Sequence, residues 1–155
     1  MRIAARLKDD GLAATAARVQ SVTDLRAYDA FVIGSAVYTG HWLIPAGHFI
    51  EDNQAVLAAH PVWLFSSGPV GGTATGRPAV SPLGIVALGA TVSAREHRIF
   101  AGAFDRSTVE GADLEKVERF IAKRFVPEGD FRDWTEIDAW ADEIARDLSV
   151  AVAAR

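Results

Sequence analysis

The amino-acid sequence predicts an α/β fold with a parallel sheet, on three observations. Short apolar runs end in glycine or serine, as do strands that are buried on both faces of a parallel sheet. Segments with helical spacing of apolar residues lie between these runs, so strands alternate with helices. The chain has 155 residues, and 50% of them are hydrophobic, which suits one compact domain over residues 1–155.

The N-terminal part begins with a helix. Over residues 2–10, Ile3 and Leu7 lie four positions apart on one helical face, and Gly11 follows as a C-terminal cap. The segment Leu12–Val22 is a weak strand candidate, because its alanines are poor strand formers. We expect a short edge strand there.

A strand–helix–strand unit follows. The run Ala30–Ile33 predicts a buried strand that ends at Gly34, and Pro61–Phe65 predicts a second one. Between them, Trp42–His60 has helical spacing, with Pro45 in its first turn. The crossover between the two strands should be right-handed.

The second half of the chain continues the alternation. Glycine, proline and hydroxyl residues predict a loop over residues 71–82, and a helix weakened by glycine comes next. The elements expected after the loop are the helix Leu83–Ala94, the strand Ile99–Phe104, the helix Val109–Phe125, the turn Pro127–Asp130 and the helix Trp134–Ala153.

The last helix has two contrasting faces. Its apolar side chains repeat at three and four residues and should pack on the sheet. They are Trp134, Ile137, Trp140, Ala141, Ile144 and Leu148. The acids between them predict a solvated face and not a catalytic pair, and these are Glu136, Asp138, Asp142, Glu143 and Asp147.

Composition excludes several classes of function. The chain has no cysteine, which excludes disulfides, dithiol chemistry and iron–sulfur clusters. A formal net charge of −4 without a basic run provides no footprint for nucleic acid. The sequence shows neither a long apolar run nor a signal peptide, so we expect a cytoplasmic protein without a transmembrane segment.

Common catalytic and metal-binding motifs are also absent from the sequence. There is no nucleophile elbow, no phosphate loop of the nucleoside triphosphatases and no dinucleotide fingerprint. The histidines show no ligand spacing, so we expect no metal site, and the sequence identifies no catalytic residue. The four are His41, His48, His60 and His97.

The candidate site follows from the sheet. Open parallel sheets bind ligands at the carboxyl ends of their strands, which here are followed by Gly34–Trp42 and Ser66–Gly72. Glycine lets a backbone approach a flat ring closely, and Tyr38 or Trp42 could stack on it. Neither segment contains a carboxylate, so they suit the edge of a ring and not a metal. The same residues also fit ordinary turns, and both interpretations stay open.

Longer strings resemble a known family. Tyr28–Tyr38 followed by Gly40–Trp42 resembles the third strand and flavin-ring loop of flavodoxin-domain proteins. Pro61–Gly71 resembles their fourth strand and second ring loop, and Arg95–Phe104 their fifth strand. Within the family, the strings are most similar to the menaquinone-dependent protoporphyrinogen oxidase group, which shares the Gly40–His41 pair.

The resemblance implies a flavodoxin-like three-layer sandwich, with a parallel sheet in the order 2-1-3-4-5. It implies an FMN-binding oxidoreductase or electron-transfer protein that works with a quinone or a redox partner protein, with oxidation of protoporphyrinogen as the specific reaction. By the same resemblance, the residues along the FMN ring would be Ser35, Ala36, Val37, Tyr38, Gly40, Ser67, Gly68, Pro69, Val70 and Gly71.

One departure from the family pattern bears on this function. In the family, a strand and a phosphate-binding loop precede the first helix, whereas here Arg2–Leu7 already resembles the later part of that helix. We therefore expect an N-terminally truncated flavodoxin-like domain, through a late start codon or a real deletion. FMN binding by the chain as given should be weak or absent, and another chain could pair at the exposed sheet edge.

A different class of function is a flavin-free, degenerate flavodoxin domain that acts as an interaction or regulatory module. A phosphorylation receiver is disfavoured, because the strand that ends near Ile33 is followed by Gly34–Val37, which has no aspartate to accept a phosphoryl group.

Overall fold

A computed structural model describes residues 2–68, 80–105, 107 and 128–153. The chain divides into two compact units, one made of residues 1–18 with 133–155 and the other of residues 19–132. The prediction of a single domain over residues 1–155 stays a prediction.

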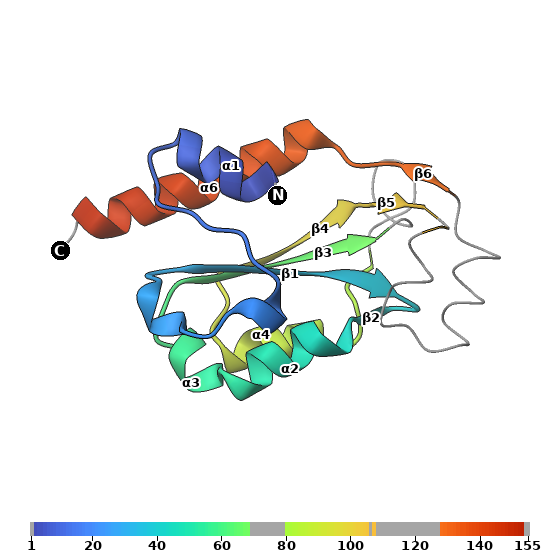
Figure 1. Cartoon of the computed structure of the whole chain (residues 1–155), viewed down its shortest axis with the longest axis horizontal. Helices are drawn as coiled ribbons and strands as arrows, with labels where there is room; N and C mark the ends of the chain where they lie inside the picture. Colours follow the sequence, from blue (N-terminus) through green and yellow to red (C-terminus); the bar gives the residue numbers. More distant parts are fainter. Residues whose placement is uncertain (1, 69–79, 106, 108–127, 154–155) are drawn as a thin grey trace. The chain divides into compact units, whose positions relative to one another are not determined.

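The larger unit is built on a mainly parallel sheet (Figure 1). Strands β1 (Phe31–Tyr38), β3 (Val62–Gly68) and β4 (Glu96–Ala101) pair in parallel, and the short β2 (His41–Trp42) returns antiparallel to the end of β1. The order is β2-β1-β3-β4. This arrangement confirms the α/β class with a parallel sheet.

The strands extend further than the apolar runs predict. Strand β1 does not end at Gly34 but continues to Tyr38, and β3 continues to Gly68. Strand β4 begins at Glu96, three residues before the predicted Ile99. The reason is pairing, because a backbone ladder needs a neighbouring strand and not an apolar side chain at each position.

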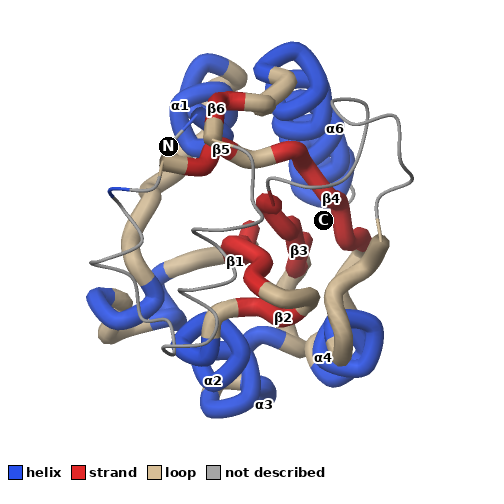
Figure 2. The backbone as a smooth tube through the Cα atoms, turned by 90° about the vertical axis from the view of Figure 1, so that its right-hand side faces the viewer, coloured by secondary structure: helices blue, strands red, loops and turns tan. Residues whose placement is uncertain are grey.

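Three helices cover one face of this sheet (Figure 2), namely α2 (Ile44–Asp52), α3 (Gln54–Leu57) and α4 (Ile85–Thr91). The single helix predicted over Trp42–His60 is wrong. Trp42 belongs to β2, and the helix breaks at Asn53, whose side-chain Nδ2 donates to the carbonyl of Phe49 at 2.8 Å. Pro45 does lie in the first turn of α2, as predicted.

Helix α4 is shorter than the predicted Leu83–Ala94. It begins after Gly84, which has a φ of +77°. A left-handed residue there cannot continue a right-handed helix toward Leu83.

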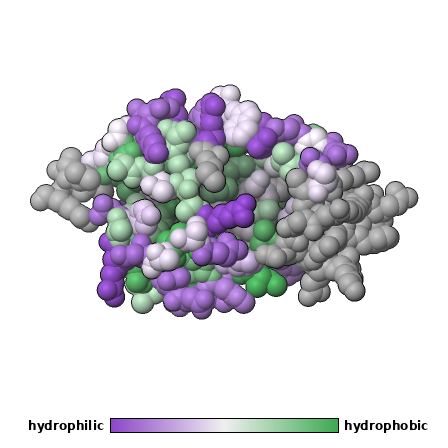
Figure 3. All heavy atoms as spheres, viewed as in Figure 1, coloured by the Kyte–Doolittle hydropathy of each residue, from purple (hydrophilic) through white to green (hydrophobic). Residues whose placement is uncertain are grey.

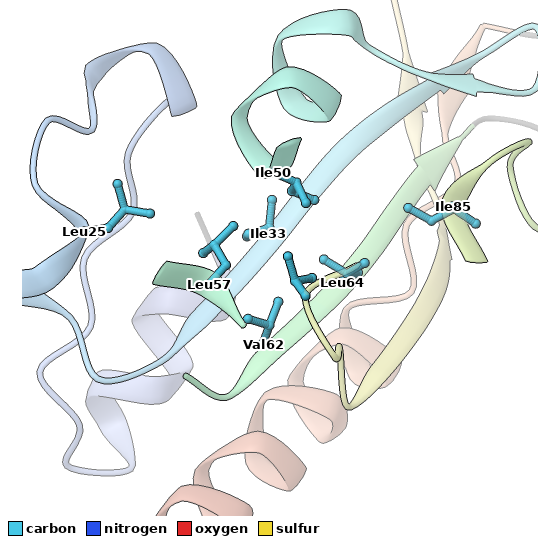
Figure 4. Close-up of a cluster of buried hydrophobic side chains, with 8 residues drawn as sticks. Leu25, Ile33, Ile50, Leu57, Val62, Leu64 and Ile85 are labelled. Atoms are coloured by element: carbon cyan, nitrogen blue, oxygen red, sulfur yellow. The ribbon is translucent and has the colours of Figure 1, made fainter. Parts of the chain in front are cut away.

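The hydrophobic core lies between these helices and the sheet (Figure 4). Its buried members are Leu25, Ile33, Ile50, Leu57, Val62, Leu64, Ile85 and Val92.

The edge strand predicted over Leu12–Val22 is wrong. Leu12–Arg18 has no regular structure, and two short 3₁₀ helices follow, η1 (Val19–Ser21) and η2 (Leu25–Ala27). The low strand propensity of alanine accounts for this. Among the described residues, no strand therefore pairs with β1 over Phe31–Ala36 on the edge away from β3.

A second, two-stranded sheet joins β5 (Ala103–Phe104) and β6 (Gly129–Asp130). Half of the turn predicted over Pro127–Asp130 is therefore strand β6, and Pro127 lies outside the described residues. The predicted helix Val109–Phe125 and most of the predicted loop 71–82 also lie outside them.

The smaller unit pairs α1 (Arg2–Asp9) with α6 (Trp134–Ala153), and α6 has the predicted bounds. The predicted cap of α1 is confirmed, because Gly11 has a φ of 86° and Leu12 donates its N–H to the carbonyl of Leu7 at 3.0 Å. Helix α6 buries Ile137, Trp140, Ala141, Ile144 and Ala145, and Leu148 is half-buried. Trp134 is wrongly predicted to be packed, since it is 39% exposed.

The acidic face of α6 is not simply solvated. Arg2 donates to Asp138 at 2.7 and 2.5 Å, and Arg6 donates to Asp142 at 2.5 and 3.0 Å. These bidentate pairs join α1 to α6 and lower the pKa values of both aspartates.

Of the helices that the structure describes, none is long and apolar enough to cross a membrane.

Candidate functional site

The two predicted ring segments lie side by side at the carboxyl ends of β1 and β3. Ser35 pairs in register with Ser66, and Ala36 with Ser67. A Cβ atom added to Gly68 would lie 3.7 Å from Cβ of Val37. Gly34–Tyr38 and Ser66–Gly68 are thus the last residues of two paired strands and not free loops, which corrects the sequence-based interpretation for these residues.

The turn between β1 and β2 gives the site its shape. Tyr38 pairs with His41, and the two residues between them, Thr39 and Gly40, have φ values of 50° and 86°. Positive φ at both central positions defines a type I′ hairpin, which glycine adopts freely and a β-branched residue adopts at a cost. Strained residues of this kind cluster at functional sites.

Neighbouring elements hold the hairpin in place. The carbonyl of Gly40 accepts the N–H of Leu83 at 2.8 Å, which ties the turn to the segment before α4. The buried hydroxyl of Ser35 donates to the carbonyl of Ala36 at 2.9 Å and accepts the N–H of Leu43 at 3.0 Å. The Ser35 hydroxyl is thus engaged within the protein.

Trp42 is also engaged, which narrows the choice of a stacking residue. Its indole Nε1 donates to Oγ of Ser66 at 2.7 Å, and its ring centroid lies 6.5 Å from that of His97. Tyr38 is half-buried at the end of β1, and burial raises the pKa of its phenol. Tyr38 is therefore the better candidate for contact with a flat ligand.

A polar network beneath the hairpin was not found by sequence reasoning. Oγ of Ser66 lies 2.7 Å from Nε2 of His97, so the indole of Trp42, the hydroxyl of Ser66 and the imidazole of His97 form one chain. Burial lowers the pKa of His97, and the nearby carboxylate of Glu96 opposes this shift. The sequence offers one signal, because His97 falls in the string Arg95–Phe104 that resembles a family strand, but this position does not reveal its partners.

Gly102, which follows the last residue of β4, lies close to the end of β3 and so to the predicted site. Its N–H donates to the carbonyl of Gly68 at 2.7 Å. A Cβ atom on Gly102 would lie 2.9 Å from Oγ of Ser67 and 3.2 Å from the carbonyl carbon of Gly68. The predicted site residues Pro69, Val70 and Gly71 lie outside the described residues.

The hairpin itself carries little charge. The hairpin segment Gly34–Trp42 contains no Asp, Glu, Lys or Arg, and His41 on it is exposed. Apolar side chains are exposed at the lower edge of the molecule in Figure 3, and Ile44, the first residue of α2, is 64% exposed. An uncharged, partly apolar rim suits a neutral ring or an apolar partner.

Fold and candidate site together define an α/β protein with a mainly parallel sheet, whose candidate site is formed by the carboxyl ends of neighbouring strands. The flavodoxin domain family model matches residues 1–124, and the chain belongs to this family. Proteins with this domain generally bind FMN and transfer electrons. No curated protein and no solved structure matches the chain.

Proposed function

We propose that this protein is an FMN-dependent redox protein whose ring site is the β1–β2 hairpin and the end of β3. The observation that carries the proposal is the juxtaposition of two uncharged strand ends beside a strained type I′ turn. A bound FMN would supply the electron-transfer chemistry, while the protein positions and tunes the ring.

The described residues fit the ring end of the cofactor. Among the described residues, and apart from its chain neighbours, no atom lies within 4 Å of a Cβ atom added to Gly40, so a flat group can approach its backbone. Tyr38 offers an aromatic face beside it. Ser67 and Gly68 bring a hydroxyl and a strand end to the other side, and the proposal extends to Pro69, Val70 and Gly71.

Binding of the phosphate is the weaker part of the site. The residues assigned to the site all belong to the ring end, and none of them is a charged donor. Charged hydrogen bonds contribute about 1.5–3 kcal/mol each, or roughly tenfold or more in affinity. We therefore expect the chain as given to bind FMN weakly and to bind riboflavin, which lacks the phosphate, with similar affinity.

Titration of the purified chain with FMN and with riboflavin, followed by flavin fluorescence, tests this. Tyr38→Leu should weaken both flavins by about fivefold, since aromatic contact contributes about 1 kcal/mol. Tyr28→Leu is the matched control, because Tyr28 contacts Phe31 at the start of β1, at a ring distance of 6.1 Å, and should change nothing. Preference for FMN by more than about tenfold would show a phosphate site and contradict the expectation of similar affinities, whereas no binding of either flavin would contradict the proposed function.

The specific reaction that we propose is oxidation of protoporphyrinogen, with a quinone taking up the electrons and protons that leave the porphyrinogen. Its support is the similarity of Gly34–Trp42 to that oxidase group. Anaerobic incubation of FMN-loaded protein with protoporphyrinogen and menaquinone should produce protoporphyrin fluorescence. Absence of turnover by protein that does bind FMN would refute the reaction and leave electron transfer to a partner protein.

A flavin-free interaction module is the second candidate, favoured by the open edge of β1. The N–H of Phe31 donates to the carbonyl of Pro61 on the β3 side, so by strand alternation the backbone groups of Val32 and Gly34 point to the other edge. Within the described part of the chain, no strand pairs with them. Concentration-dependent protection of these two amides from hydrogen exchange, without flavin binding, would favour this candidate.

A further inference from the structure

The strongest observation outside the proposed ring contacts is the polar chain of Trp42, Ser66 and His97. It joins side chains of β2, β3 and β4, and strand β1 lies between β2 and β3 in the sheet. Ser66 is 0% exposed, and both of its hydrogen bonds measure 2.7 Å. A buried hydroxyl with two short bonds has little freedom in how its proton is placed.

The chemistry of the three side chains determines which atom donates the proton in each of the two hydrogen bonds. An indole N–H can only donate, so Oγ of Ser66 accepts from Trp42. Within the described residues, the remaining partner of this hydroxyl is Nε2 of His97. The Ser66 proton has an acceptor only if Nε2 is unprotonated, because a buried donor left without an acceptor is costly. The contacts of the described residues thus favour a neutral His97 that carries its proton on Nδ1.

We infer that His97 is a positioning residue for the β1–β2 hairpin, acting through Ser66 on Trp42. Neutral His97 accepts the Ser66 hydroxyl and so fixes the orientation in which Ser66 accepts the indole N–H. The indole then holds β2, and with it the Thr39–Gly40 turn, against the sheet. The hydroxyl of Ser35, the register partner of Ser66, supports the same hairpin from β1 through the N–H of Leu43.

Protonation of His97 breaks this arrangement. Nε2–H would donate to Oγ of Ser66, which can accept it beside the indole N–H, but the Ser66 proton would then have no acceptor among the described residues. The ionisable groups on the elements around His97 are few. Glu96 is its neighbour on β4 and forms an ion pair with Arg98 at 2.7 Å. Strand β3 and helix α4 have no ionisable residue. Strand β2 carries His41, and helix α2 carries His48, Glu51 and Asp52. Of these groups, Glu96 acts on the titration of His97, and it favours the charged form.

Nuclear magnetic resonance of the full chain tests the inference without any flavin. Imidazole ¹⁵N shifts at high pH should show the Nδ1–H tautomer for His97. The indole N–H resonance of Trp42 should shift with the same midpoint as His97. Below that midpoint its exchange with solvent, relative to the intrinsic rate of free tryptophan at the same pH, should accelerate by about fivefold, the loss expected for one hydrogen bond. An Nε2–H tautomer of His97, or an indole resonance of Trp42 that does not shift when His97 titrates, would overturn the inference.

Three variants separate positioning from simple packing. Ser66→Ala removes a hydrogen bond that favours neutral His97, so the pKa of His97 should rise. His97→Gln keeps an acceptor for Ser66 but cannot titrate, so the Trp42 resonance should stay at its high-pH position at every pH. His60→Gln is the control, because His60 bonds the carbonyl of Val56 at 2.8 Å, away from the hairpin, and should leave Trp42 unaffected. An unchanged pKa of His97 in the Ser66→Ala protein would refute the action of His97 on Trp42 through Ser66.

The consequence for ligand binding rests on the proposed function. Riboflavin affinity should fall as the pH drops through the pKa of His97 in the unmodified protein, and stay constant in His97→Gln. If no flavin binds at any pH while the coupled titration is seen, the flavin proposal fails and the positioning role stands. If flavin binds with the same pH dependence in both proteins, the positioning role fails and the flavin proposal stands.

Discussion

Gly34 offers the sharpest test of packing in the sheet, because it lies where a side chain has no room. It pairs in register with Phe65, and a Cβ atom added to Gly34 would lie 2.0 to 2.4 Å from three atoms at the far end of the Phe65 ring. That ring also contacts Phe100, at a centroid distance of 6.1 Å. Substitution of Gly34 by alanine must therefore displace an aromatic ring from an established contact.

The expected size of the effect follows from two opposing contributions. Overpacking costs about 1–3 kcal/mol in protein interiors. Replacement of glycine by alanine restricts the unfolded chain and returns about 0.4–1 kcal/mol. Gly34→Ala should therefore destabilise the protein by about 1–2 kcal/mol, which lowers the Tm by about 2–8 °C for a chain of this length.

Urea unfolding followed by tryptophan fluorescence measures the change. Phe65→Leu removes the ring atoms that meet residue 34, so in that background Gly34→Ala should cost little, with a coupling energy of about 1–2 kcal/mol. Gly47→Ala on α2 is the matched control, because, beyond its own helix backbone and chain neighbours, no described atom lies within 4 Å of its added Cβ. It should stabilise the protein by about 0.5–1 kcal/mol. A cost for Gly34→Ala that is the same with Phe65 or with leucine would refute the steric explanation.

Other predictions concern both units. Trp140 is 0% exposed, so Trp140→Ala should lower the free energy of unfolding in urea by about 3–5 kcal/mol. Asp138→Asn should have a smaller effect that vanishes at high salt, because the pair of Asp138 with Arg2 is partly exposed. Equal effects of the two substitutions would contradict the faces assigned to α6. Gly102→Ala should lower the Tm, because its Cβ would press on the backbone of Gly68, and an unchanged Tm would refute this close approach. The lowered pKa of His97 means that the unfolded chain binds more protons, so its contribution to stability is complete above about pH 6.5 and is lost as the pH falls toward the folded pKa. The urea midpoint of His97→Gln should therefore fall less on acidification than that of the unmodified protein.

Local signals in the sequence determined much of the fold. The apolar runs located the centres of β1 and β3, the spacing of apolar residues determined the bounds of α6, and Gly11 marked the end of α1. Each of these features depends on residues near one another in the chain, so a single segment carries enough information to predict it. The position of the candidate site at the strand ends also followed, because the ends of parallel strands meet at one edge.

Only the tertiary structure decided what the individual side chains in the site do. Gly34 was predicted to end a strand beside a ligand, yet it accommodates the ring of Phe65 from the neighbouring strand. Trp42 was a stacking candidate, yet its indole bonds to Ser66, and through that hydroxyl it reaches His97. These partners lie 24 and 31 residues apart in the chain, and strand register brings them together. Register depends on how whole strands align in the sheet, so no local pattern in the sequence encodes such contacts.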